Sequence, residues 1–473
     1  MSSDSDSPTT MSEPGGFWSA VRESLQGTER DFTTGKLNRA VGILAVPMVL
    51  EMAGESVFAV CDAFFVARLG SEALAAVGLT ESALEIIYAV AVGLSMATTA
   101  LVARRTGEKD PRGAARAGIQ AIVIGIVTAI VFGVAGIWFA PTLLGSMGAS
   151  PATVEMGTSY TRVMYAGMAT ILLLFLNNAI YRGVGDAATA MRALWIANAI
   201  NLVLDPCLIF GWGPFPELGL TGAAVATTIG RGTGVLYQFW GFSRSKRLRM
   251  IREDVSFDLG IIKTLLRLSA GGVGQMLIAT ASWVALVRIL ATFGSDVLAG
   301  YVISIRIVIF IILPAWGLSN AAATLVGQNL GAGKPERAEQ AVWLTGMWNM
   351  SFMATVTVIF LVFGRHIVSF FTTDPYVLSV GVDCLRIISY GYVFYAWGMV
   401  TMQAFNGAGD TATPTRINFF CFWMFQIPLA YFLAMETAIG PAGVFWAIAL
   451  AYSLSAVVGV LLFRRGKWKE KKV

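Results

Sequence analysis

The 473-residue sequence contains few of the side chains that hold metals or form disulfide bridges. It has four cysteines, no CxxC pair and one histidine, His366, which argues against the usual zinc and disulfide patterns. Charged residues make up only 13% of the chain, against about 25% in soluble globular domains. No GxxxxGKS or GxxxxGKT segment occurs, so we expect no P-loop for ATP.

The shortage of charge accompanies a large excess of apolar residues. Hydrophobic residues make up 56% of the chain, and its mean hydropathy is +0.68. Apolar runs of about 20 residues, long enough to cross a bilayer as helices, recur along the sequence, and no secretory signal pattern precedes them. We therefore predict an all-α integral membrane protein of the plasma membrane with twelve transmembrane helices. These lie near 41–66, 74–103, 117–140, 157–181, 193–212, 219–242, 264–290, 297–327, 340–364, 379–404, 416–434 and 441–463.

Basic residues are distributed unevenly between the two sides of the predicted membrane. Of the 34 Lys and Arg residues, the two tails and the loops predicted on their side hold 27, whereas the opposite loops hold two, Arg68 and Arg365. This asymmetry follows the positive-inside rule and predicts that both termini are cytoplasmic. The net charge of +5 is therefore a topology signal, and we expect no nucleic-acid partner.

A repeat with an offset of 224 residues divides the chain into two units. The segment GVGDAATAMR at 183–192 returns as GAGDTATPTR at 407–416, and LGSEALAAVG at 69–78 faces FGSDVLAGYV at 293–302. Because each unit holds six spans, the two repeats are parallel and form an N-lobe and a C-lobe. The predicted organisation is a cytoplasmic tail (1–40), the N-lobe (41–242), a cytoplasmic linker (243–263), the C-lobe (264–463) and a cytoplasmic basic tail (464–473).

Two parallel six-helix lobes joined by a charged, flexible linker are typical of a transporter whose lobes rock around a central site. We expect the substrate to bind between the lobes, near the middle of the membrane. Since the sequence has no P-loop, the energy for transport must come from an ion gradient.

Three acidic residues lie within the first predicted span, in and just before the segment GESVFAVCDAFFVARLG (54–70). A charged side chain in mid-span costs at least ~2.5–3.5 kcal/mol, so it is expected to face a cavity or a partner. Glu51, Glu55 and Asp62 fall within about 40° on one helical face and extend over about 16 Å. They form a file of groups able to bind protons or cations. The structural alternative is an acid held by a buried arginine, for which Arg231 is the obvious partner.

A second polar group lies in the outer half of the fifth span. Asn201 and Asn198 precede Asp205 by four and seven residues and share its helical face. Pro206 is expected to weaken the helix locally and to free backbone carbonyls. Carboxylate, amide and carbonyl oxygens suit Na⁺, whereas two close acids in a desolvated site equally suit proton exchange.

The repeat supplies an internal comparison for these residues. At the 224-residue offset, Asp62, Glu55, Asp205 and Asn201 face the apolar residues Leu286, Ala279, Leu429 and Phe425. The ion site is therefore predicted to belong to the N-lobe alone. The turns after spans 4 and 10 are matched between the units and are predicted to be architectural. Their residues are Gly183, Gly185, Asp186, Gly407, Gly409 and Asp410.

Several motifs together resemble the multidrug and toxic compound extrusion (MATE) transporters. They are CDAFFVARLGSEALAAVGL (61–79), the paired GxGDxxT turns, LDPCLIFGWGPFPELGLTGAAVAT (204–227) and LVGQNLGAGKPERAEQAV (325–342). The resemblance covers about residues 36–463. It implies a non-enzymatic antiporter without a cofactor that exports organic, often cationic and amphipathic compounds in exchange for Na⁺ or H⁺. We expect a monomer whose partners are small organic substrates and the lipid bilayer.

The resemblance also implies a branch within the family. One branch carries acids in spans 7 and 10, whereas this chain has no acid in span 7 and has Tyr395 at the span 10 position. The chain instead resembles the branch named for a DNA-damage-inducible protein, whose ion-site residues fall on Asp62, Asp205 and Asn201. Glu55 stands where that branch usually has an amide, which leaves the coupling ion open.

The substrate cavity and two other functions complete the predictions. Tyr88, Tyr165, Tyr395 and Met168 are candidates for lining the cavity. A flippase of the same superfamily, moving a lipid-linked intermediate, is the nearest alternative. GxGD is also a signature of intramembrane aspartic proteases, but here it occurs twice, at short turns outside the spans, which disfavours an enzyme.

Overall fold

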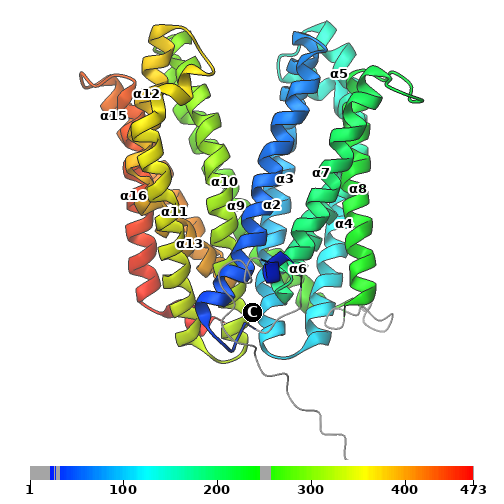
Figure 1. Cartoon of the computed structure of the whole chain (residues 1–473), viewed down its shortest axis with the longest axis vertical. Coiled ribbons are helices and arrows are strands. Elements are labelled where there is room, and N and C mark those ends of the chain that lie inside the picture. The colour runs from blue at the N-terminus through cyan, green and yellow to red at the C-terminus, as the bar shows by residue number, and fades with distance from the viewer. Residues whose placement is uncertain (1–21, 26, 28–31, 246–256, 472–473) are drawn as a thin grey trace, which may run out of the picture.

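The computed structural model describes residues 22–25, 27, 32–245 and 257–471, and the central part of the predicted linker, 246–256, lies outside them. The described residues form helices and connecting turns, with no strand among them. Two bundles of helices meet at one end and separate at the other, so the molecule has the outline of a V (Figure 1). The start of the first long helix and the C-terminal end both lie at the closed end.

Each lobe is one consecutive stretch of the chain. The N-lobe contains α2 (Leu37–Ala67), α3 (Ser71–Gly107), α4 (Pro111–Ser146), α5 (Pro151–Ala166), α6 (Met168–Val184), α7 (Ala187–Phe210) and α8 (Leu220–Arg244). The C-lobe contains α9 (Leu259–Ala291), α10 (Ser295–Gly331), α11 (Pro335–Ser369), α12 (Pro375–Tyr390), α13 (Tyr392–Gly407), α14 (Ala412–Asn418), the π-helix η2 (Phe419–Gln426), α15 (Ile427–Met435) and α16 (Ala442–Arg464). A short 3₁₀ helix, η3 (Lys467–Glu470), follows.

The helices match the twelve predicted spans. Among the described residues, nine helical segments are long and apolar enough to cross a membrane singly, with α14, η2 and α15 counted as one. Two further spans are bent pairs, α5 with α6 at 42° and α12 with α13 at 57°. The remaining predicted span, 219–242, corresponds to α8, which is not among the helices that are apolar enough by this measure. Pro206 does not break α7, which continues through it to Phe210, so the expected local weakening is not seen.

The repeat is visible in the backbone as well as in the sequence. The two bent spans break at Gly167 and Gly391, which are 224 residues apart. Gly70 and Gly294, at the same offset, precede α3 and α10 with φ of 100° and 104°, a conformation that favours glycine. The same backbone conformation at equivalent positions indicates that the two units share one fold.

The paired GxGD turns cap helices at the closed end. Gly185 and Gly409 adopt φ of 90° and 81°, and each is followed by the aspartate. The Asp186 carboxylate accepts hydrogen bonds from the backbone N–H of Thr189 at 3.2 Å and from its hydroxyl at 2.7 Å. Such N-caps satisfy backbone donors at a helix start. Gly183 and Gly407 pack closely against α3 and α10, where a Cβ would collide with Val102 or with the backbone of Ala323.

The first helix of each lobe packs against the other lobe at the closed end. Val41 and Leu44 of α2 are buried in a cluster with Leu318, Ala321 and Leu325 of α10. In the equivalent contact, α9, the first helix of the C-lobe, packs against α3 of the N-lobe. The residues in contact are Leu265 and Leu268 with Leu94, Ala97 and Leu101.

Closely packed glycines and backbone groups complete this closed interface. A Cβ on Gly107 would overlap the carbonyl oxygen of Gln328, and one on Gly331 would overlap that of Arg104. These two contacts are again related by the 224-residue offset. Gln328 also donates a hydrogen bond across the interface to the Gly183 carbonyl at 2.9 Å.

Both predicted tails contribute to the closed end. Part of the predicted N-terminal tail is packed there, because α2 begins at Leu37 and Phe32 is only 3% exposed. Its ring is apolar and packs in the same cluster as Val41. In the C-terminal tail, Trp468 is 1% exposed and stacks on Phe463 at 4.7 Å between ring centroids. The neighbouring Lys471 lies 3.4 Å from Asp410, and its carbonyl accepts a hydrogen bond from Arg104 of the N-lobe.

Candidate functional site

Asp205 lies at the centre of a buried polar group in the N-lobe. Its side chain projects from α7 and is fully buried, and its Oδ1 accepts a hydrogen bond from Asn201 at 3.2 Å. The same Asn201 amide also donates to the Thr227 hydroxyl of α8 at 3.1 Å. The second carboxylate oxygen, Oδ2, has no hydrogen-bond partner in the described part of the chain. A buried polar atom without a partner is costly and points to a missing ligand or proton.

Asp62 approaches this group from α2. Its side chain is half-buried and makes no hydrogen bond or ion pair with the described residues. Asp62 and Asp205 are close enough to interact electrostatically. A carboxylate, an amide and a hydroxyl therefore converge from α7 and α8, with the Asp62 carboxylate of α2 as an electrostatic neighbour, and these oxygen donors fit the hard-ligand preference of Na⁺ or could exchange a proton.

The C-lobe has no equivalent of this group among its described residues. Leu286, the counterpart of Asp62, is 2% exposed and belongs to the apolar core of the C-lobe. Leu429, the counterpart of Asp205, packs against the same core. Where the N-lobe carries acidic residues, the C-lobe therefore packs apolar side chains into its core.

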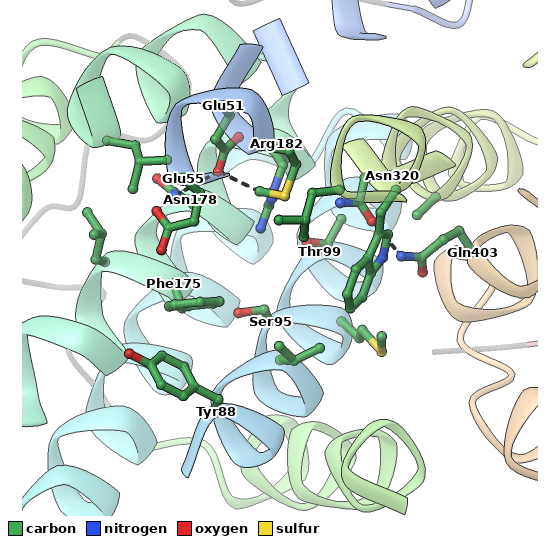
Figure 2. Close-up of a pocket in the computed structure, with 18 of the residues that line it drawn as sticks. Glu51, Glu55, Tyr88, Ser95, Thr99, Phe175, Asn178, Arg182, Asn320 and Gln403 are labelled. Atoms are coloured by element: carbon green, nitrogen blue, oxygen red, sulfur yellow. Dashed lines mark hydrogen bonds and ion pairs between the residues drawn. The ribbon is translucent and has the colours of Figure 1, made fainter. Parts of the chain in front are cut away.

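Glu51 does not share a cluster with Asp205 but belongs to a separate buried network. Its Oε1 accepts a hydrogen bond from Asn178 at 2.9 Å and lies 3.5 Å from the Arg182 guanidinium (Figure 2). Asn178 in turn accepts a hydrogen bond from Gln238 of α8. Arg182 is one of the 27 basic residues counted as topology signals in the sequence, yet it is the partner of a buried acid.

Removing Arg182 is expected to destabilise the N-lobe. In Arg182→Leu the Glu51 carboxylate would remain buried without its counter-charge, and breaking a buried pair in this way costs about 3–5 kcal/mol. Unfolding of the purified protein in detergent measures the loss. Arg162→Leu is the control, because Arg162 is exposed on α5. Adding Glu51→Gln should recover most of the loss, and a single variant as stable as the wild type would contradict the network.

Glu55 and Asn198 occupy the space between these two polar groups. Asn198 donates a hydrogen bond to the Gly54 carbonyl at 3.2 Å and so ties α7 to α2 instead of pointing to Asp205. Glu55 is half-buried and makes no hydrogen bond or ion pair with the described residues. Arg231 is an electrostatic neighbour of Glu55 and of Asp62, but its hydrogen bond goes to the Tyr88 hydroxyl at 3.2 Å. No described acid is therefore locked to Arg231, as the structural alternative required.

A cavity between the lobes lies beside these residues. Its N-lobe wall includes Glu51, Glu55, Tyr88 and Arg231, and Figure 2 shows Asn320 and Gln403 on the opposite side. The cavity volume is about 230 Å³. A neighbouring pocket in the C-lobe includes Tyr395, which stacks on Tyr452 at 4.3 Å between ring centroids.

Two of the four predicted cavity residues are wrong. Tyr165 and Met168 are 6% and 1% exposed and belong to the N-lobe core. The ring of Tyr165 lies directly over Gly136, where a Cβ would collide with it. Because Gly167 bends the span between them, both side chains are turned into the bundle and away from the cleft.

Closer to the open end, the cleft widens into a pocket of about 490 Å³. Glu81 and Glu85 of α3 line one side. The other side belongs to the C-lobe and is mainly apolar and aromatic, with the partly exposed Trp283 and Tyr452 among its residues. An amphipathic molecule would meet an acidic wall and an aromatic wall at once.

Comparison with known proteins agrees with this arrangement. A family model described as MatE matches residues 47–207 and again residues 273–432, once in each lobe. The chain belongs to the MatE family. The two matched stretches correspond to the internal repeat, and the membership rules out the intramembrane protease that the GxGD turns had raised as an alternative.

Relatives and solved structures match most of the chain. The probable multidrug resistance protein YoeA of Bacillus subtilis strain 168 is 25% identical over 92% of this chain and 95% of its own length. A protein named FAD transporter from Shewanella oneidensis strain MR-1 is 26% identical over 79% of this chain and 83% of its own length. A multidrug resistance MATE family transporter of the MOP superfamily, solved in an outward-facing conformation, superposes with a TM-score of 0.87 at 27% identity, over 95% of this chain and 99% of that one.

The sequence alone indicated part of this site. The spacing of Asn201 and Asp205 predicted their contact. The repeat predicted that the C-lobe carries apolar residues at the equivalent positions. Thr227, Asn178 and Gln238 were missed, although each is a polar residue within an otherwise apolar span. Polar residues in such spans are rare enough to serve as a signal.

Proposed function

We propose that this MatE protein is a secondary antiporter of the plasma membrane that exports organic, mainly cationic and amphipathic compounds in exchange for Na⁺ or H⁺. The observation that carries the proposal is the polar group around Asp205. It has an unpartnered carboxylate oxygen, a second acid beside it and no counterpart in the described C-lobe. An ion bound there would satisfy the unpaired oxygen and reduce the repulsion between the two acids.

The proposed cycle is alternating access by rocking of the two lobes. The V-shaped arrangement supports an outward-facing state, with the closed end and both termini on the cytoplasmic side (Figure 1). Ion binding at Asp62 and Asp205 draws α2, α7 and α8 together, because these helices supply the donors. This movement changes the wall of the adjacent cavity and releases the exported compound. By linkage, the bound compound must weaken ion binding by the same factor.

The substrate class is inferred from the walls of the cleft. Glu81 and Glu85 would attract an organic cation, while Trp283 and Tyr452 would bind its apolar body. The relative named FAD transporter raises a flavin dinucleotide as a second candidate. Arg182 and Arg231 in the inner cavity favour an anion, but the two acids of the outer pocket oppose a doubly charged one.

The test is efflux of a fluorescent cationic dye from proteoliposomes that contain the wild-type protein. A Na⁺ gradient, a H⁺ gradient and no gradient are imposed in separate samples, with protein-free liposomes as the control. We expect one gradient to accelerate efflux and the other to have no effect, which names the coupling ion. Dye movement that is independent of both gradients would reject the antiporter and favour the flippase alternative.

A further inference from the structure

We infer that the inner cavity between Glu55 and Arg231 binds the zwitterionic part of a substrate, a cationic group and an anionic group carried by one compact molecule. The inference rests on the proposed function, because it narrows the class of compound that the cleft accepts. A site for cations alone would require only acidic residues. This cavity instead presents one unpaired charge of each sign.

The charges of the cavity separate into one satisfied pair and two unsatisfied groups. Four charged residues line it: Glu51, Glu55, Arg182 and Arg231. Glu51 and Arg182 form a buried ion pair at 3.5 Å. Within the described residues, neither Glu55 nor Arg231 has an oppositely charged partner within the 4.0 Å of an ion pair.

Arg231 keeps most of its binding capacity free. A guanidinium has five N–H donors and stays protonated in proteins. The hydrogen bond to Tyr88 uses one donor, and the Phe58 ring lies 5.9 Å from the guanidinium carbon. Glu55 and Asp62 balance this permanent charge at longer range, which leaves the free N–H donors of Arg231 able to bind an anion directly. Glu55 and Asp62 are electrostatic neighbours only, so a ligand anion can approach more closely than either.

The remaining walls suit a small amphipathic zwitterion. Tyr88 and Phe175 form a tilted aromatic pair at 6.0 Å on the N-lobe side, and Trp316 faces them from the C-lobe. Asn320 and Gln403 supply amides that accept or donate hydrogen bonds. With a volume of about 230 Å³, the cavity is below the roughly 300–1,000 Å³ of sites for whole drug-sized ligands. It therefore fits the charged part of a molecule whose apolar part extends into the wider outer pocket.

Two dyes that differ by one ester test the inference. Rhodamine 110 carries a delocalised cation and a carboxylate, whereas rhodamine 123, its methyl ester, keeps only the cation. Binding of both to the purified full-length protein is measured by fluorescence polarisation. We expect the wild type to bind rhodamine 110 at least tenfold more tightly. Equal binding, or tighter binding of the ester, would overturn the inference without any variant being needed.

Variants then test which residues cause the preference for rhodamine 110. Arg231→Gln should remove the preference by weakening rhodamine 110 at least tenfold without weakening rhodamine 123, and Arg231→Lys should keep part of the preference. Glu55→Gln should weaken both dyes. Arg162→Gln, at an exposed arginine of α5, should change neither. Thermal unfolding of each variant checks folding, and a folded Arg231→Gln protein that binds both dyes equally weakly would assign Arg231 a structural role and reject the inference.

The outcomes also separate this inference from the proposed function. Dye binding requires no gradient, so a protein that prefers rhodamine 110 but drives no efflux would contradict the antiporter alone. A protein that exports rhodamine 123 under a gradient but binds both dyes equally would contradict the zwitterion site alone.

Discussion

Replacing Asp205 by Asn is expected to abolish ion-coupled export. The substitution preserves the shape of the side chain and its contact with Asn201, but it removes the charge that a bound ion or proton neutralises. Loss of a supporting group around a metal ion already costs about 10–100-fold in affinity, so loss of a ligand itself should cost at least as much. Asp62→Asn should have a similar effect. Because the two acids act in one site, the double variant should lose little more than either single variant.

Gradient-driven dye efflux and direct binding of radioactive sodium measure this loss. Asp383→Asn is the matched control, since Asp383 is an exposed acid of α12 in the C-lobe. Its efflux should equal that of the wild type. Wild-type efflux in a folded Asp205→Asn protein would show that coupling takes place elsewhere, and the unpartnered oxygen would then need another explanation.

Gly107→Leu is expected to prevent the lobes from meeting at the closed end. A Cβ at this position would already overlap the Gln328 carbonyl oxygen, and that oxygen belongs to the backbone of a helix, which cannot move aside alone. Overpacking of this kind costs about 1–3 kcal/mol, which shifts an equilibrium by about 5–150-fold. The outward-facing state should be depleted and export should fall by a comparable factor.

Energy transfer between fluorophores attached to α4 and α11 at the closed end reports the separation of the lobes. The control is Gly145→Leu on α4, because no heavy atom lies within 4 Å of a Cβ there. If Gly107→Leu leaves both the energy transfer and the export unchanged, the contact with Gln328 does not hold the lobes together.

The sequence predicted the features that depend on repetition and on local spacing. The 224-residue offset predicted the two lobes, and an i, i+4 relation predicted the Asn201 contact with Asp205. Arg182, by contrast, lies next to a turn, and its pairing with Glu51 depends on how the separate helices α6 and α2 are placed in the folded bundle. Tyr165 and Met168 were misplaced because a bend at Gly167 decides which way they point. Phe32 belongs to the closed end through contacts far along the chain, including hydrogen bonds from Arg337 of α11 to its carbonyl.

The packing of the first helix of each lobe against the other lobe also bears on whether a single repeat could be stable alone. Val41 and Leu44 of the first repeat, and Leu265 and Leu268 of the second, are buried by the opposite repeat. A single six-helix unit would therefore leave this apolar face of its first helix uncovered. Isolated, such a unit would present that apolar stripe near the membrane surface. Two identical units related by a twofold axis along the membrane normal would cover it mutually. In this chain the two repeats cover each other in that way, so each lobe depends on the other for the burial of its first helix.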